Sequence, residues 1–168
     1  RGTLVSIEAL TGVYSTEVTP RGNKAELVKV NMGIPSLRPA AFPAAISGEG
    51  PVLDLPLSTD SGNYEGVLVN TGVPHVVIFV PDLEAIDLER EGKQIEHNPL
   101  FTRKANVNFV EVKRPDYLAV RVWERGAGPT LACGTGACAV LVAAVLTNRS
   151  PRRATVALPG GEMIIEWS

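Results

Sequence analysis

Apolar and polar positions alternate with a period of two along much of the chain, which predicts β-strands. Residues 12–18 and 25–30 alternate on either side of the turn sequence Pro-Arg-Gly-Asn at 20–23, so they predict a hairpin. Residues 4–10 predict an earlier strand. Further strands are expected at 64–70, 76–80, 105–113, 117–123, 154–158 and 162–167, the last two forming a hairpin around Pro159-Gly160-Gly161.

Two segments have other patterns and predict helices. Residues 132–147 are apolar on all sides, as expected of a buried helix. Residues 82–94 predict a short surface helix with Asp82 as its N-cap. The proline-rich segment 33–56 predicts an extended connector, with a helical turn around 40–46 as one option. The order of elements therefore predicts an α+β fold in which a mostly antiparallel β-sheet wraps around a central apolar helix.

Composition narrows the class of protein. The chain has 168 residues, of which 45% are hydrophobic and 20% charged, so it is expected to be one soluble globular domain, or one domain with part of another. A net charge of -2 does not suit binding to nucleic acid or to an anionic membrane surface. The apolar run at 130–146 is interrupted by glycines and is shorter than the roughly 20 residues that span a bilayer. We expect neither a nucleic-acid nor a membrane partner.

The two cysteines do not form a disulfide framework. Cys133 and Cys138 fall on one predicted helix, where a separation of five residues places them about 140° apart around the axis. Since this geometry does not favour a bridge, a reducing compartment is expected. The two histidines, His75 and His97, do not have the spacing of a zinc site, so no metal is expected.

Cys133 lies at the predicted start of the apolar helix, beside Gly134-Thr135-Gly136. Glycines let a substrate approach the backbone closely, and the free N–H groups of a helix start bind anions. The positive end of a helix also favours the thiolate, which is the reactive form of cysteine. Cys133 is therefore a candidate catalytic base or nucleophile, with the role of a small buried hydrophobic residue as the alternative. Cys138, inside the apolar helix, fits that structural role.

Polar residues beside the predicted strands are further candidates. Glu124 and Arg125 form either a solvated pair or a site in which Glu124 accepts an ammonium group and Arg125 binds a carboxylate. His75 precedes an apolar strand, in a structural or a functional role. Asn106 and Asn108 share one face of a predicted strand, where buried hydrogen bonds or recognition of a polar ligand would explain them.

Taken together, these segments resemble the diaminopimelate epimerase family. The matching pieces occur in the family's order: Gly72-Val73-Pro74-His75, Ala105-Asn106-Val107-Asn108-Phe109-Val110, Trp123-Glu124-Arg125-Gly126, Leu131-Ala132-Cys133-Gly134-Thr135-Gly136-Ala137 and Leu158-Pro159-Gly160-Gly161. The resemblance implies a cofactor-free conversion of LL-diaminopimelate to the meso isomer, in lysine and peptidoglycan precursor biosynthesis. One cysteine thiolate removes the α-proton, and a second cysteine, as the thiol, delivers a proton to the opposite face.

The resemblance also implies roles for single residues. Cys133 would be one of the two cysteines, with Glu124 and His75 around the reacting α-amino centre. Asn106 and Arg125 would hold the far carboxylate of the substrate. The N–H groups of Gly134 and Thr135 would hold the near carboxylate and stabilise the developing carbanion, as preorganised donors do.

Several features depart from the family pattern. The chain has no Cys-Gly-Asn-Gly-like motif for a second catalytic cysteine, and Val73 stands where the family commonly has Asn. The chain opens with Arg1 rather than Met and stops at Ser168, where relatives continue by another strand. We therefore expect a piece of a longer epimerase, with residues 1–34 a remnant of the N-terminal domain and 35–168 the C-terminal domain. Such a piece would need the missing N-terminal domain for turnover.

Two other functions stay open. A related cofactor-independent isomerase, of the proline racemase or phenazine-biosynthesis type, would share the architecture, but Arg125 with Asn106 favours a substrate that has a second carboxylate. A non-catalytic module could bind an amino acid at the same helix end. A bacterial cytoplasm is the expected location, with a plastid stroma as the alternative, and a homodimer is one assembly that the sequence leaves open.

Overall fold

The chain divides into two compact units. The computed structural model describes residues 2–9 and 12–168, and the units are Arg1–Ile34 and Pro35–Ser168. Leu10, the last residue of the first predicted strand, lies outside the described residues. None of the helices in the described part of the chain has the length and apolar character needed to cross a bilayer.

The first unit is a three-stranded antiparallel sheet in the order β1–β2–β3. Its strands are β1 (Thr3–Ala9), β2 (Gly12–Arg21) and β3 (Lys24–Val30). The predicted hairpin is confirmed, and its turn contains Gly22 at a φ of 61°. Leu4, Val13 and Leu27 are 76%, 70% and 61% exposed. Among residues 2–9 and 12–34, no second apolar layer covers these side chains.

The second unit is built on an eight-stranded sheet in the order β11–β10–β8–β7–β6–β5–β4, with β9 paired to β8. β6 and β7 pair in parallel, as do β8 and β10, and the other neighbours are antiparallel. The expected mostly antiparallel sheet is thus confirmed. The strands are β4 (Leu55–Thr59), β5 (Gly62–Asn70), β6 (Pro74–Phe79), β7 (Asn106–Arg114), β8 (Tyr117–Glu124), β9 (Gly128–Thr130), β10 (Arg153–Leu158) and β11 (Gly161–Glu166).

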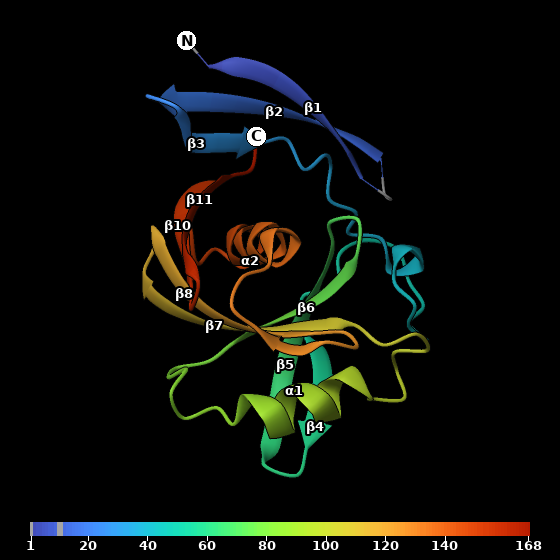
Figure 1. Cartoon of the computed structure of the whole chain (residues 1–168). Coiled ribbons are helices and arrows are strands. Elements are labelled where there is room, and N and C mark those ends of the chain that lie inside the picture. The colour runs from blue at the N-terminus through green and yellow to red at the C-terminus, as the bar shows by residue number, and fades with distance from the viewer. Residues whose placement is uncertain (1, 10–11) are drawn as a thin grey trace. The chain divides into compact units, whose positions relative to one another are not determined.

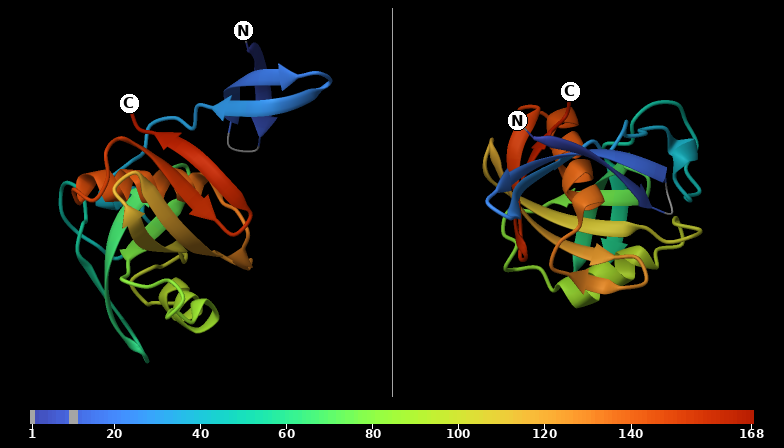
Figure 2. Two further views of the ribbon diagram at one scale, coloured as in Figure 1. Left: turned by 90° about the vertical axis from the view of Figure 1, so that its left-hand side faces the viewer. Right: turned by 45° about the horizontal axis from the view of Figure 1, so that its top comes forward.

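Helix α2 (Gly134–Leu146) lies inside the curve of this sheet, as Figures 1 and 2 show. It contacts β5, β6 and β7 on one side and β10 and β11 on the other. Ala139, Val140 and Leu141, which point in different directions around the helix, are all 0% exposed. The predicted central apolar helix is confirmed, because a helix that is apolar all round must be enclosed.

Helix α1 (Leu88–Glu96) packs against the opposite face of the sheet, beside β4, β7, β8 and β9. The central strands are therefore buried on both faces, and their side chains alternate between two apolar clusters. On β5, Val67 and Val69 join the cluster around α2, whereas Leu68 joins the cluster around α1. Burial on both faces explains why the strand at 76–79 is continuously apolar.

The predicted start of α1 is wrong. The helix begins after Asp87, whose side chain accepts a hydrogen bond from Arg90 N at 3.2 Å and so acts as the N-cap. Asp82 instead accepts from Glu84 N at 2.9 Å, which closes a local turn two residues long. Asn and Asp side chains stabilise both kinds of structure, so an aspartate alone does not locate the helix start.

Three other elements differ from the sequence-based expectation. Strand β4 was not expected, and its first two residues fall in the predicted connector 33–56. Leu55 and Leu57 are buried, while Pro56 is exposed on the edge of the sheet, where proline is tolerated. The helical turn is a 3-10 turn at Pro39–Ala41, shorter than 40–46. The short strand β9 had no counterpart among the predicted elements.

The close packing of α1 on β8 predicts an unusual response to a glycine substitution. Gly92→Ala would normally stabilise a helix by about 1 kcal/mol. Here a Cβ at Gly92 would lie 2.7 Å from Cβ and Cγ of Trp123, so the variant is expected to unfold more easily by about 1–3 kcal/mol in urea titrations. Gly134→Ala is the matched control, because a Cβ there meets nothing within 4 Å. A Gly92→Ala protein as stable as the control would contradict this packing.

Candidate functional site

The site is centred on Cys133, the N-cap residue of α2. Its backbone is extended (φ −147°, ψ 106°), and its Sγ accepts a hydrogen bond from Gly136 N at 3.4 Å. The N–H groups of Gly134 and Thr135 have no acceptor within the helix, as is usual in a first turn. Gly134 is exposed, and a side chain there would meet nothing within 4 Å. The helix end therefore offers two N–H donors beside the sulfur, next to open space.

Thr135 links the cysteine to His75 on β6. The Thr135 hydroxyl lies 3.4 Å from Cys133 Sγ and 3.1 Å from His75 Nε2. The Thr135 carbonyl accepts a hydrogen bond from the Thr71 hydroxyl at 3.0 Å, which ties the helix start to the loop before β6. His75 is thus joined to Cys133 through one intervening hydroxyl.

His75 is a neutral, interior side chain. It is 0% exposed, and burial together with the nearby Arg125 charge lowers its pKa from 6.5 to about 4. At neutral pH the imidazole therefore carries a single ring proton. The ring is fully buried, and its Nε2 atom is hydrogen-bonded to the Thr135 hydroxyl.

Asn106 lies beside His75, its register partner across the parallel β6–β7 pair. Its Nδ2 donates to Pro74 O at 3.2 Å, and its Oδ1 accepts from Arg125 N at 2.8 Å. One end of the carboxamide therefore holds the main chain at the start of β6, and the other end holds the main chain just after β8. The Arg125 side chain is exposed and donates through Nη1 to Arg103 O at 3.1 Å.

Glu124 and Arg125 bond to other groups and not to each other. Glu124 Oε1 accepts from the Thr130 hydroxyl at 2.6 Å, across the short β8–β9 pair. The two side chains therefore have separate supports.

Glu96 on α1 is a supporting residue that sequence reasoning missed. It is 3% exposed and accepts hydrogen bonds from Trp123 Nε1 at 2.8 Å and Gly126 N at 3.0 Å, with Lys104 Nζ 3.4 Å away. Burial raises the pKa of Glu96, but these donors outweigh burial and lower it. Asn106 thus holds the main chain at Arg125, and Glu96 holds it at the next residue, Gly126, in the turn after β8. Thirty residues separate Glu96 from Gly126, so no local pattern indicates the contact.

Cys138 lies farther along α2. It is half-buried and so is less enclosed than the interior position expected for it. Burial, and secondarily the neighbouring Cys133, raise the pKa of its thiol. A raised pKa leaves less thiolate at neutral pH and so disfavours reactivity.

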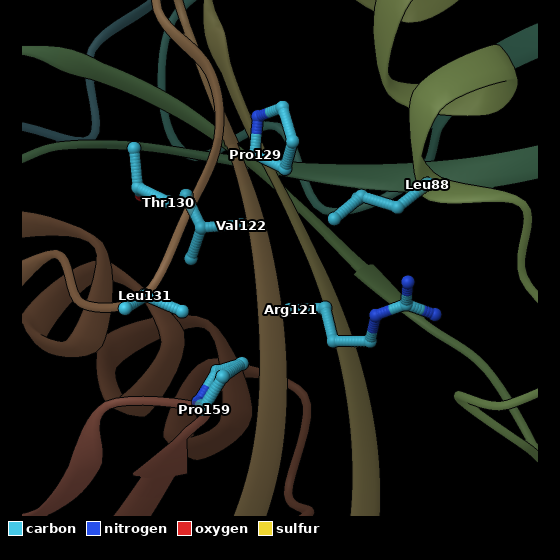
Figure 3. A pocket seen from close by; sticks show the side chains of 7 residues that line it. All are labelled: Leu88, Arg121, Val122, Pro129, Thr130, Leu131 and Pro159. Atoms are coloured by element: carbon cyan, nitrogen blue, oxygen red, sulfur yellow. The ribbon is translucent and has the colours of Figure 1, made fainter.

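A pocket of about 300 Å³ lies near the chain that leads to Cys133, but none of the predicted site residues lines it (Figure 3). Its charged lining residue, Arg121, uses Nη1 to donate to the carbonyls of Leu83 and Ile86 at 3.1 and 3.0 Å. The remaining lining is mostly apolar: Leu88, Val122, Pro129, Thr130, Leu131 and Pro159. This pocket is therefore separate from the cysteine-centred site.

The lowered pKa of His75 predicts a loss of stability as the pH falls from 7 to 5. Below pH 6.5 the unfolded chain protonates this imidazole, whereas the folded protein does so only near pH 4, so the free energy of unfolding falls across this window. The contribution of His75 to that fall is about 2 kcal/mol. Urea titrations at pH 7 and 5 should show a smaller fall in His75→Gln than in the wild type. An equal fall in both proteins would show that His75 does not carry the effect.

The sequence matches the diaminopimelate epimerase family model over residues 67–168, more than half of the chain. A diaminopimelate epimerase of Desulfitobacterium hafniense is 48% identical over 163 residues, covering 97% of this chain and 57% of that protein. One from Acaryochloris marina is 52% identical over 153 residues, covering 90% of this chain and 54% of that protein. The chain therefore spans a little over half the length of these curated relatives.

Solved structures of amino-acid isomerases share the fold. A probable proline racemase from Agrobacterium radiobacter with bound carbonate has a TM-score of 0.70 and 16% identity, covering 97% of this chain and 51% of that one. A hydroxyproline epimerase from Agrobacterium vitis with bound trans-4-hydroxy-L-proline has a TM-score of 0.68 and 18% identity, with the same coverage. These two resemblances bear on the fold alone. The family match, joined with the high identity to the curated relatives, shows that the chain belongs to the diaminopimelate epimerase family.

Proposed function

We propose that this chain supplies one of the two catalytic cysteines of a cofactor-independent epimerase that converts LL-diaminopimelate to its meso isomer. The observation that carries the proposal is the placement of Cys133 as the N-cap of α2, with the N–H groups of Gly134 and Thr135 open beside its sulfur. The proposed base, Cys133, and the proposed anion site at Gly134 and Thr135 thus lie within one helical turn.

In the proposed reaction the Cys133 thiolate takes the α-proton of the substrate. The C–H bond breaks, the proton joins the sulfur, and the electron pair stays on the α-carbon. A thiol from the other half of the protein then forms the new C–H bond on the opposite face. The N–H groups of Gly134 and Thr135 bind the carboxylate on the same carbon and stabilise the charge that develops there.

The far end of the substrate is assigned to Arg125, because its guanidinium is exposed and can form a bidentate pair with a carboxylate. Asn106 contributes by holding the Arg125 main chain. Glu124, oriented by Thr130, is assigned to an ammonium group of the substrate. His75 supports the catalytic cysteine through Thr135, and Val73 offers no polar contact where many relatives have Asn.

The rest of the proposed enzyme would cover the first unit. Leu4, Val13 and Leu27 expose large apolar surfaces on the three-stranded sheet, and such surfaces usually mark a place where another protein segment packs. We assign this role to the remainder of the N-terminal domain, which would also bring the second cysteine. The two free cysteines suit a reducing compartment, and the proposed location is the cytoplasm.

The first test is epimerisation of LL-diaminopimelate in deuterium oxide. The chain alone is expected to give no turnover, because inversion needs a base on each face of the α-carbon. Adding the N-terminal segment of a close relative should restore inversion, with deuterium entering at the α-carbon. Cys133→Ser should abolish this activity, whereas Cys138→Ser should retain it. Inversion by the chain alone, or by the restored Cys133→Ser protein, would contradict the two-base assignment.

The second test concerns the substrate. Because a hydrogen bond to a charged group is worth about 1.5–3 kcal/mol, Arg125→Ala is expected to raise the KM of the restored enzyme for diaminopimelate by about 10- to 100-fold. Arg153→Ala is the matched control, since Arg153 is an exposed arginine that pairs with Glu166 on the β10–β11 hairpin. If Arg125→Ala behaves like the control, a monocarboxylate such as proline becomes the better substrate candidate.

A further inference from the structure

We propose that Asn108 is a positioning residue that selects the ring tautomer of His75 and thereby aims the Thr135 hydroxyl proton at the Cys133 sulfur. The hydrogen-bond chain is a property of the structure itself, and its catalytic meaning rests on the function proposed above. Asn108 is fully buried, and its side chain makes no hydrogen bond to the sulfur. Its effect would pass through two other side chains.

The orientation of the Asn108 carboxamide follows from its partners. One atom lies 3.2 Å from Val76 O, and because a backbone carbonyl can only accept, that atom is the amide nitrogen Nδ2. The same nitrogen lies 3.1 Å from His75 Nδ1. Nδ2 carries two protons, so it can donate to both groups.

This orientation determines the histidine tautomer. His75 Nδ1 faces a donor and must therefore accept, so the single proton of the neutral ring lies on Nε2. Nε2 then donates to Thr135 Oγ1, which leaves the hydroxyl proton of Thr135 free to point at Cys133 Sγ. Every donor in the chain from Asn108 to His75, Thr135 and Cys133 points toward the sulfur.

The opposite tautomer would reverse this direction. With the proton on Nδ1, Nε2 would accept the Thr135 hydroxyl proton, and none would remain for Cys133. With the assigned tautomer, the sulfur receives Thr135 Oγ1–H as well as Gly136 N–H. Both donors can hydrogen-bond the charged sulfur that removes the α-proton in the proposed reaction. Asn108 therefore controls one of the two donors at the sulfur.

An asparagine at position 108 leaves a buried oxygen without a hydrogen-bond partner, which lowers the stability of the folded protein. Asn108 is 0% exposed, and its Oδ1 is the one buried side-chain oxygen or nitrogen without a partner in the described residues. A Cβ at Gly136 would lie 2.7 Å from that oxygen and 3.2 Å from Cys133 Sγ. An apolar residue at position 108 would avoid the unpaired oxygen but would supply no proton to His75, so the donor role accounts for asparagine here.

The experiment uses the chain itself and does not depend on epimerisation. Nitrogen-15 NMR of the His75 ring at pH 7.5 should show a protonated Nε2 and an unprotonated Nδ1 in the wild type. Asn108→Leu, which keeps the branching at Cγ and removes the donor, should bring in the Nδ1–H tautomer. Its Cys133 should react with iodoacetamide about tenfold more slowly relative to Cys138, the internal reference, since one donor to a charged group is lost.

Val110→Ala is the matched control, because Val110 is buried on the same face of β7 and has no hydrogen-bonding side chain. It should leave the tautomer and the ratio of the two thiol rates unchanged. Thr135→Val should slow Cys133 as Asn108→Leu does, and the double variant should be no slower than either single variant, because both break one chain.

The outcomes separate the two proposals. A protonated Nδ1 in the wild-type ring would overturn the role of Asn108 even if Asn108→Leu failed to fold, and would leave the epimerase proposal intact. Additive effects of Asn108→Leu and Thr135→Val would also overturn it. The assigned tautomer and slowed Cys133, found together with no epimerisation by the restored protein, would instead overturn the proposed function.

Discussion

The enclosure of α2 is the constraint on which the rest of the structure depends. A helix that is apolar around its whole circumference cannot lie on a surface, so the sheet must curve around it and close with the β10–β11 hairpin. Enclosure fixes the axis of the helix and, with it, the place of its first turn. Cys133 is therefore held by the core of the unit and not by a surface loop.

Polar groups that surround the buried end of a helix must form hydrogen bonds with one another, because a buried group without a partner is destabilising. Thr71 bonds the Thr135 carbonyl, His75 bonds the Thr135 hydroxyl, and Asn106 and Glu96 hold the main chain after β8. Such a network leaves its side chains little freedom, as the proposed reaction at one carbon atom would require. The same enclosure keeps His75 neutral, so the imidazole contributes hydrogen bonds and not charge.

Much of the fold could be predicted from the sequence because period-two runs and an all-apolar helix are unambiguous patterns. The prediction failed where two residues competed for one role, as Asp82 and Asp87 did, or where Pro56 concealed an edge strand. For the site, the ordered motifs named Cys133, Thr135, His75 and Arg125, and the structure brings the first three into one hydrogen-bonded cluster. The supporting contacts of Glu96 and the hydrogen-bond partners of Asn108 could not be inferred, because these partners are distant in sequence and are determined by the packing of α1 and β6.

The contact between Asn108 and Gly136 has a consequence for how such chains can diverge. A Cβ at position 136 would lie 2.7 Å from the carboxamide oxygen, and 3.2 Å from Cys133 Sγ, so a mutation that adds a methyl group there requires residue 108 to become smaller or turn away and Cys133 to shift slightly. The two positions, one on a strand and one on a helix, are thus coupled, and the order of substitutions matters. Substitutions at positions 108 and 136 are therefore expected to covary among related sequences, although the two positions belong to different sequence motifs.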